Sequence, residues 1–476
     1  MSRVRIIAKN TGALLLSQIV SYIFTFFITM YAARYFGANI FGIWSIALSI
    51  TGIMGIIVDL GMSTLMVREV SRNLSARDKY LTNILVIKVI LSILTFGLIM
   101  IITNIIGYTE IVKNVIYILT VSVIVGSFAG ILGAIFQVNE KMEYISLSTI
   151  LSSIIMLLGT GIMIYYNLGI IFFAFLNVIS AALVSAYIII KYVQKFPLPE
   201  LKIDFSFWKL TIKESWPFGV TALSGMLYNY IDSVMLSIAQ GAEVVGWYSA
   251  AYRLMLILLF IPNAVNMAIF PVMSQFYTSS KDSLKLMNEK YFKYMIILGV
   301  PAGVGITILS DKIILMIFGS GYTQSIIALQ ILIWTIILTF AGAPFVQLLQ
   351  SINKQFIITK ISVMSAAINI ALNLFLIPSF SYIGASFSTL IAAIISTGYI
   401  FLVTYKIGYG IHYKTVINDL SKVLFATLIM SIFIFYFKDL NLFLLCIMAT
   451  LLYFIIIYII GCIDEVDIML IKQIRR

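Results

Sequence analysis

Long apolar stretches alternate with short polar segments along almost the whole chain. A helix needs about 20 consecutive apolar residues to cross the hydrocarbon core of a bilayer. Read at that length, the pattern predicts fourteen transmembrane helices and an all-α polytopic membrane protein. Their expected spans are 10–34, 41–66, 81–106, 112–136, 144–166, 169–192, 215–239, 244–275, 291–309, 325–350, 357–377, 382–405, 423–437 and 440–461.

A helical break recurs in this pattern. The segment FGANIFGIWSIA, residues 36–47, returns 204 positions later as QGAEVVGWYSAA, residues 240–251. The tripeptide Gly-Tyr-Thr at 107–109 also returns at 321–323. Transporters are often built from two such copies that rock about a central site. The repeat therefore predicts two pseudo-symmetric six-helix lobes, and the even number of helices in each places their symmetry axis along the membrane normal.

The longest stretch without membrane character, residues 191–213, lies between the two copies and contains two prolines and five lysines. The aromatic residues Phe205, Phe207 and Trp208 beside the lysines indicate a short amphipathic segment on the membrane surface. A solvated connector explains this composition equally well. The expected organisation is an N-terminal lobe at 1–193, a cytoplasmic linker at 194–213, a C-terminal lobe at 214–405, and helices 13 and 14 with a cytoplasmic tail at 406–476.

Composition and charge place the chain in a membrane and orient it there. Hydrophobic residues make up 62% of the chain and charged residues 11%, with a mean hydropathy of +1.08, whereas a soluble domain carries roughly 25% charged residues. Twenty-five lysines and arginines fall in loops on one side, and only Lys113, Lys312 and Lys438 fall on the other. The positive-inside rule then puts both termini in the cytoplasm of a cell-membrane protein. The net charge of +12 favours anionic lipid head groups and no nucleic acid as partners.

The predicted outer loops are too short for catalysis. The longest, at 310–324, holds one Asp and one Lys, which disfavours a membrane polysaccharide polymerase or ligase. The only histidine, His412, falls in a predicted cytoplasmic loop, and the sequence has no Cys/His cluster at metal-ligand spacing. We therefore expect neither an enzyme nor a bound metal.

Ionisable residues inside the predicted helices are the candidate substrate-binding residues. A charge at the bilayer centre costs about 2.5–3.5 kcal/mol on insertion scales, so it usually lines a cavity or has a partner. Asp59 and Lys88 lie at one depth on neighbouring helices, so a structural ion pair explains them as well as a site does. Arg253 lies near mid-bilayer, and Asp232 lies two turns below the predicted outer end of its helix. Arg34 lies at a helix end and is able to snorkel to the surface.

These residues also predict the character of the substrate and the gate. Arg68 and Glu69, at the inner end of the second helix, are expected to form a boundary ion pair or an inner gate. Three cations in one cavity would suit an anionic substrate, especially a phosphate, through charge-assisted hydrogen bonds. They are Arg34, Lys88 and Arg253. No cofactor is expected, and Asp232 or Asp59 is the candidate for coupling to protons or sodium.

Two segments resemble a known family. AARYFGANIFGIWSIALSI at 32–50, followed by VDLGMSTLMVREVSR at 58–72, resembles the start of oligosaccharide flippases of the polysaccharide transporter family. YNYIDSVMLSIAQGAEVVGWYSAAYRL at 228–254 is similar to the seventh and eighth helices of that family. The family includes O-antigen flippases and belongs to the multidrug/oligosaccharidyl-lipid/polysaccharide exporter superfamily.

The resemblance implies a function and a set of residues. It implies two six-helix lobes around a cavity lined by helices 1, 2, 7 and 8. The implied activity moves a polyprenyl-diphosphate-linked oligosaccharide from the inner to the outer leaflet by alternating access, for cell-surface glycan synthesis. Membrane lipids and a glycan polymerase are the other partners expected. The positions that match the family's motifs are Arg34, Asp59, Arg68, Asp232 and Arg253.

Two rivals to this function remain within the superfamily. Lipid II flippases of this architecture carry more arginines in helix 1, whereas this chain has only Arg34 there, so a peptidoglycan precursor is disfavoured. A multidrug or organic-cation exporter is the alternative. Such an exporter would require a more acidic, aromatic cavity than these candidates provide.

Overall fold

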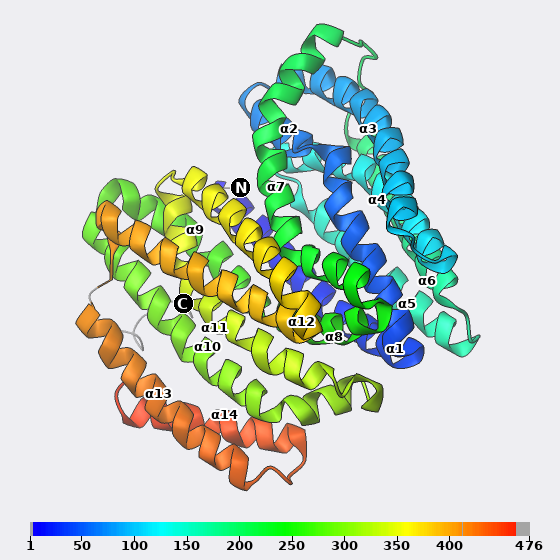
Figure 1. Cartoon of the computed structure of the whole chain (residues 1–476). Coiled ribbons are helices and arrows are strands. Elements are labelled where there is room, and N and C mark those ends of the chain that lie inside the picture. Colours follow the sequence, from blue (N-terminus) through cyan, green and yellow to red (C-terminus); the bar gives the residue numbers. More distant parts are fainter. Residues whose placement is uncertain (1–2, 412, 463–476) are drawn as a thin grey trace. The chain divides into compact units, whose positions relative to one another are not determined.

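The computed structural model describes residues 3–411 and 413–462, and these residues are helical over most of their length (Figure 1). The predicted tail beyond residue 462 and His412 lie outside the described residues. The helices are α1 (Arg3–Asp59), α2 (Met62–Arg72), α3 (Arg77–Ile106), α4 (Glu110–Val138), α5 (Met142–Tyr165), α6 (Ile170–Lys195), α7 (Phe205–Gln240), α8 (Ala242–Leu258), α9 (Phe260–Ser279), α10 (Lys281–Ile317), α11 (Ser325–Ser351), α12 (Gln355–Thr404), α13 (Tyr413–Tyr436) and α14 (Leu442–Ile459), with short turns at Leu74–Ala76, Ser320–Tyr322 and Tyr405–Tyr409.

The predicted fold class, an all-α polytopic membrane protein, is confirmed. Eleven segments of the described chain are long and apolar enough to cross a membrane. Two of them are too long for one crossing, because α1 has 57 residues and α12 has 50, or about 85 and 75 Å of helix. Non-helical backbone at Gly37 and Ser381 divides each into the two predicted crossings. With α7, which contains the predicted span 215–239, the described residues account for the fourteen expected spans.

Two helices predicted as continuous spans are divided in the structure, and only the second division has a proline beside it in the sequence. The expected span 41–66 ends at Asp59, because Leu60 and Gly61 both have positive φ, at 45° and 77°. The expected span 244–275 is divided between α8 and α9. Pro262 lies in the first turn of α9, where a missing backbone N–H costs least.

The chain packs into two units, which we describe separately. One unit comprises Met1–Ala250 and Ile370–Ala385, and the other comprises Ala251–Asn369 and Ser386–Arg476. This partition follows packing density, whereas the predicted lobe boundary at 194–213 follows the sequence repeat. That boundary stays a prediction.

In the second unit, the C-terminal helix pair packs along α10 (Figure 1). The Tyr453 hydroxyl of α14 donates to the carbonyl of Ile297 at 2.8 Å. At the turn between α13 and α14, Lys312 donates to two backbone carbonyls, and Lys438 pairs with Asp311 at 2.8 Å. The last two helices are therefore held at their turn as well as along their length.

In the first unit, the two copies of the repeated segment pack directly against each other. The second residue of each copy is a glycine of positive φ, 69° at Gly37 and 87° at Gly241. A Cβ atom added to Gly42 would lie 1.7 Å from the carbonyl oxygen of Ala242, and one added to Gly246 would lie 1.9 Å from that of Ala38. The contact is reciprocal, as expected where two equivalent segments cross about a two-fold axis. Glycine allows this backbone-to-backbone approach between membrane helices.

We expect Gly42→Ala to destabilise the protein, because the added methyl group collides with backbone that cannot rotate away. Overpacking of this kind costs about 1–3 kcal/mol. The apparent melting temperature in detergent should fall by several degrees. The matched control is Gly97→Ala, also within a membrane helix, where an added Cβ meets nothing within 4 Å. Equal melting temperatures for the two variants would show that the crossing is looser than described.

Candidate functional site

The predicted candidates Asp59 and Lys88 form an ion pair. Lys88 is only 1% exposed, and its Nζ lies 2.6 Å from Asp59 Oδ1. The same ammonium donates to the carbonyl of Ser127 at 2.9 Å, and the Ser63 hydroxyl donates to Asp59 Oδ1 at 2.5 Å. Asp59 is the last residue of α1, so this cluster joins α1, α2, α3 and α4 at the break. Of the two sequence-based interpretations, this geometry favours the structural ion pair, because the charge of Lys88 is already balanced.

The predicted gate residues form a network that also includes an unpredicted one. Arg68 contacts Glu69 at 2.6 Å and Glu214 of α7 at 2.9 Å. Its guanidinium lies 5.4 Å from the centre of the Phe218 ring. A Cβ on Gly61 would lie 2.6 Å from the backbone nitrogen of Gly219, so α2 and α7 meet backbone to backbone beside this network.

Glu214 was missed although the sequence carries a signal for it. It is the acidic residue at the inner end of the predicted span 215–239, at the level where Arg68 ends the neighbouring predicted span. Its side chain is 38% exposed and that of Arg68 is 37% exposed. This network is therefore water-accessible, unlike the buried pair of Asp59 and Lys88.

Asp232 is the centre of a second buried polar cluster. It is 1% exposed and accepts hydrogen bonds from the Tyr248 hydroxyl of α8 at 2.5 Å and from the Asn373 amide of α12. A buried carboxylate is tolerated only where donors replace its lost water. Asn373 was missed, although Asn369 and Asn373 stand four residues apart in a largely apolar span, a spacing that puts both on one face.

Arg34 and Arg253 have different surroundings. Arg34 is exposed and lies three residues before the break at Gly37, in the first unit. Arg253 is half-buried on α8 and belongs to the second unit. The structure thus brings together two pairs of predicted residues, Asp59 with Lys88 and Arg68 with Glu69. Within the described part of the chain, no group of three or more His, Cys, Asp or Glu residues is arranged to hold a metal ion.

A cavity of about 410 Å³ lies inside the first unit, between α2, α4, α5 and α6. One wall is the glycine face of α4, formed by Gly126, Gly130 and Gly133. Ser63 of α2, which hydrogen-bonds Asp59, also lines the cavity. The volume falls within the range of small-ligand pockets. No sequence pattern pointed to this cavity.

Family comparison places the chain among known proteins. A family model described as polysaccharide biosynthesis protein matches residues 7–277, and a model described as MatE matches residues 217–375. A probable low-salt glycan biosynthesis flippase of Haloferax volcanii is 28% identical over 179 residues, 37% of this chain and 38% of that protein. A putative O-antigen transporter of Shigella flexneri is 25% identical over 384 residues, 77% of this chain and 90% of that protein. The chain thus aligns with about two fifths of the first relative and most of the second.

Solved structures share the fold. A lipid II flippase in an inward closed conformation matches with a TM-score of 0.77 and 18% identity, covering 94% of this chain and 98% of that one. An inward-facing multidrug resistance MATE family transporter matches with a TM-score of 0.65 and 15% identity, covering 81% and 95%. At these identities the likeness establishes the architecture alone.

We expect Lys88→Met to destabilise the protein by about 3 kcal/mol. This is the lower end of the loss expected when one partner of a buried ion pair is removed, and it applies because Asp59 keeps partial access to solvent. The double variant Lys88→Met with Asp59→Asn should recover part of that loss, since no unpaired charge remains. A double-mutant cycle of unfolding free energies in detergent measures the coupling. Additive effects of the two changes would contradict the ion pair.

Proposed function

Because the chain belongs to the polysaccharide biosynthesis protein family, we propose that it is a flippase for polyprenyl-diphosphate-linked oligosaccharide. It moves this substrate from the inner to the outer leaflet of the cell membrane for surface glycan synthesis. The observation that carries the proposal is the family match across residues 7–277, which includes both copies of the repeat. The names of the relatives, a glycan biosynthesis flippase and an O-antigen transporter, support the substrate class.

The residues give this proposal a mechanism. The glycan and its diphosphate enter between the lobes, and the polyprenyl chain stays in the lipid. Arg34 and Arg253 bind the diphosphate, since guanidinium groups match phosphate oxygens in bidentate hydrogen bonds. The network of Arg68, Glu69 and Glu214 serves as the gate on the cytoplasmic side, where both termini lie. Asp232 remains the candidate for ion coupling, and a glycan polymerase remains a candidate partner.

The second candidate is a multidrug or organic-cation exporter. The MatE model matches residues 217–375, and MATE transporters share the fold. The buried acidic residue Asp232 and its neighbour Tyr248 are the groups that would suit a cation. The match covers a smaller part of the chain than the polysaccharide model does, so we place this function second.

We expect Arg253→Ala to reduce flipping of lipid-linked oligosaccharide by about tenfold or more, because a hydrogen bond to a charged group contributes about 1.5–3 kcal/mol. Proteoliposomes with a fluorescent lipid-linked glycan, digested by an external glycosidase, report the rate. Arg253→Lys should retain part of the activity, since it keeps the charge and loses the bidentate geometry.

The same vesicles distinguish the two functions. Uptake of a fluorescent organic cation without glycan flipping would replace the flippase with the exporter. Normal flipping by Arg253→Ala would remove this residue from the mechanism.

A charge-reversal series tests the gate. Arg68→Glu should abolish flipping, because it places three carboxylates together, and adding Glu214→Arg should restore it. Since the pair is partly exposed, each variant should change the unfolding free energy by less than about 1 kcal/mol. The flipping rate and the melting temperature are measured on the same preparations. A double variant as inactive as the single one would show that the pairing itself does not matter.

A further inference from the structure

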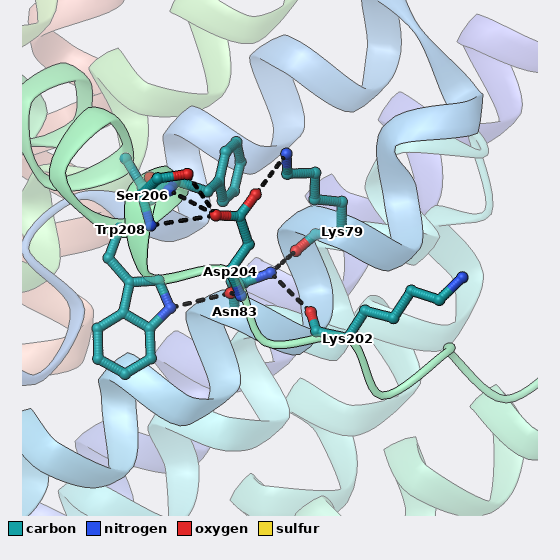
Figure 2. Close-up of polar contacts among 8 residues, drawn as sticks. Lys79, Asn83, Lys202, Asp204, Ser206 and Trp208 are labelled. Atoms are coloured by element: carbon teal, nitrogen blue, oxygen red, sulfur yellow. Dashed lines mark hydrogen bonds and ion pairs between the residues drawn. The ribbon is translucent and has the colours of Figure 1, made fainter.

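The linker between α6 and α7 is attached to the start of α3 by hydrogen bonds of Asn83 (Figure 2), and the Thr82 hydroxyl adds one to the carbonyl of Glu200 at 2.9 Å. Asn83 is fully buried, and its amide nitrogen donates to the carbonyls of Lys79 at 2.8 Å and Lys202 at 3.2 Å. Its side-chain oxygen accepts from the backbone of Asp204 at 2.8 Å and from the indole of Trp208 at 2.9 Å. Both donors and both acceptor sites of the amide are used, so this attachment is rigid.

Asp204 fixes where α7 begins. Its carboxylate caps the helix by accepting from the backbone of Ser206 and Phe207, both at 3.1 Å. Lys79 lies 2.9 Å from the same carboxylate and 4.6 Å from the centre of the Phe207 ring. Hydrogen bonds from Ser206, Lys79 and Phe207 hold the pKa of Asp204 well below its usual value, so the cap stays ionised at physiological pH. The orientation of the first turns of α7 is therefore set by α3.

In this orientation, one face of the first turns of α7 is exposed on the protein surface. We call this face the interfacial stripe, and it consists of Phe205, Lys209, Ile212, Lys213 and Trp216. The residues follow the spacing of a single helix face. Phe205 is 72% exposed and Trp216 is 57% exposed. The preceding linker also exposes two leucines, Leu198 at 70% and Leu201 at 86%.

The charges of the interfacial stripe have no ion-pair partner among the residues that the structure describes. Lys209 and Lys213 are exposed and form no ion pair with any residue that the structure describes. They stand four residues apart on one helix face, where like charges repel. An anion beside them removes this repulsion.

A membrane surface provides both an anion for the lysines and an apolar region for the exposed aromatic and aliphatic side chains of the interfacial stripe. Head-group phosphates provide anions at the level of the lysines, and the adjoining acyl region receives the aromatic and aliphatic side chains. Trp216 lies at the start of the predicted span 215–239, the level at which interfacial tryptophans gather. We propose that the interfacial stripe binds the head groups of anionic bilayer lipids and so anchors the start of α7. This inference is independent of the transported substrate.

Trp216 is a built-in probe for this binding. The protein is reconstituted in nanodiscs that contain a low, varied mole fraction of brominated phosphatidylglycerol or brominated phosphatidylcholine. The signal of Trp216 is the fluorescence difference between the native protein and Trp216→Phe. Each lysine near an anionic surface contributes roughly a fivefold preference. With two lysines in the interfacial stripe, we therefore expect half-maximal quenching of Trp216 at about a 25-fold lower mole fraction of brominated phosphatidylglycerol than of brominated phosphatidylcholine.

Two double variants distinguish lipid binding at the interfacial stripe from a general attraction of anionic lipids to the basic protein. Lys209→Gln with Lys213→Gln should equalise quenching by the two lipids while the melting temperature stays unchanged. The matched control, Lys354→Gln with Lys360→Gln, removes two exposed lysines, one from the turn before α12 and one from its start, and should keep the preference. Equal quenching in the native protein, or a preference that survives in the first variant, would overturn the proposal. Loss of quenching at high protein density would instead assign the interfacial stripe to a second copy of the chain.

Discussion

The first unit depends on the backbone crossing of the two repeat copies. At Gly42 and Gly246 the main chains come so close that no side chain fits between them. Helices in a membrane gain little from the hydrophobic effect when they associate, so such van der Waals contact is what holds them. The contact is reciprocal because each copy places its glycine against the equivalent alanine of the other copy, so the duplication of the sequence accounts for the packing.

Close approach continues along the same pair of segments toward the predicted cytoplasmic end. A Cβ on Gly52 would lie 3.1 Å from the Tyr230 ring, and Gly61 lies against Gly219. Close packing therefore holds α1 and α2 on α7, and the network around Arg68 adds ion pairs to it. A seam held by small residues separates without leaving a buried charge unpaired, which suits the alternating access that we propose.

Hydropathy predicted the helical spans because the bilayer imposes one length on every crossing. It did not predict the break at Leu60, since a positive φ at a leucine requires tertiary contacts to stabilise it. Among the candidate residues, the ion pair of Asp59 and Lys88 was predictable because the two residues lie at the same depth on neighbouring predicted helices. Glu214 and Asn373 were missed because their partners lie 146 and 141 residues away along the chain. Spacing alone cannot show such contacts.

Pro217 connects the anchored start of α7 to the rest of that helix. It lacks the N–H that would pair with the carbonyl of Lys213, so the helix is weakest just after the segment held by Asn83. Below this point α7 is fastened to α3, and above it Asp232 is bonded to α8 and α12. A movement that separates these attachments is absorbed most easily at Pro217. The linker attachment and the polar cluster are therefore able to keep their own hydrogen bonds while the helix between them bends.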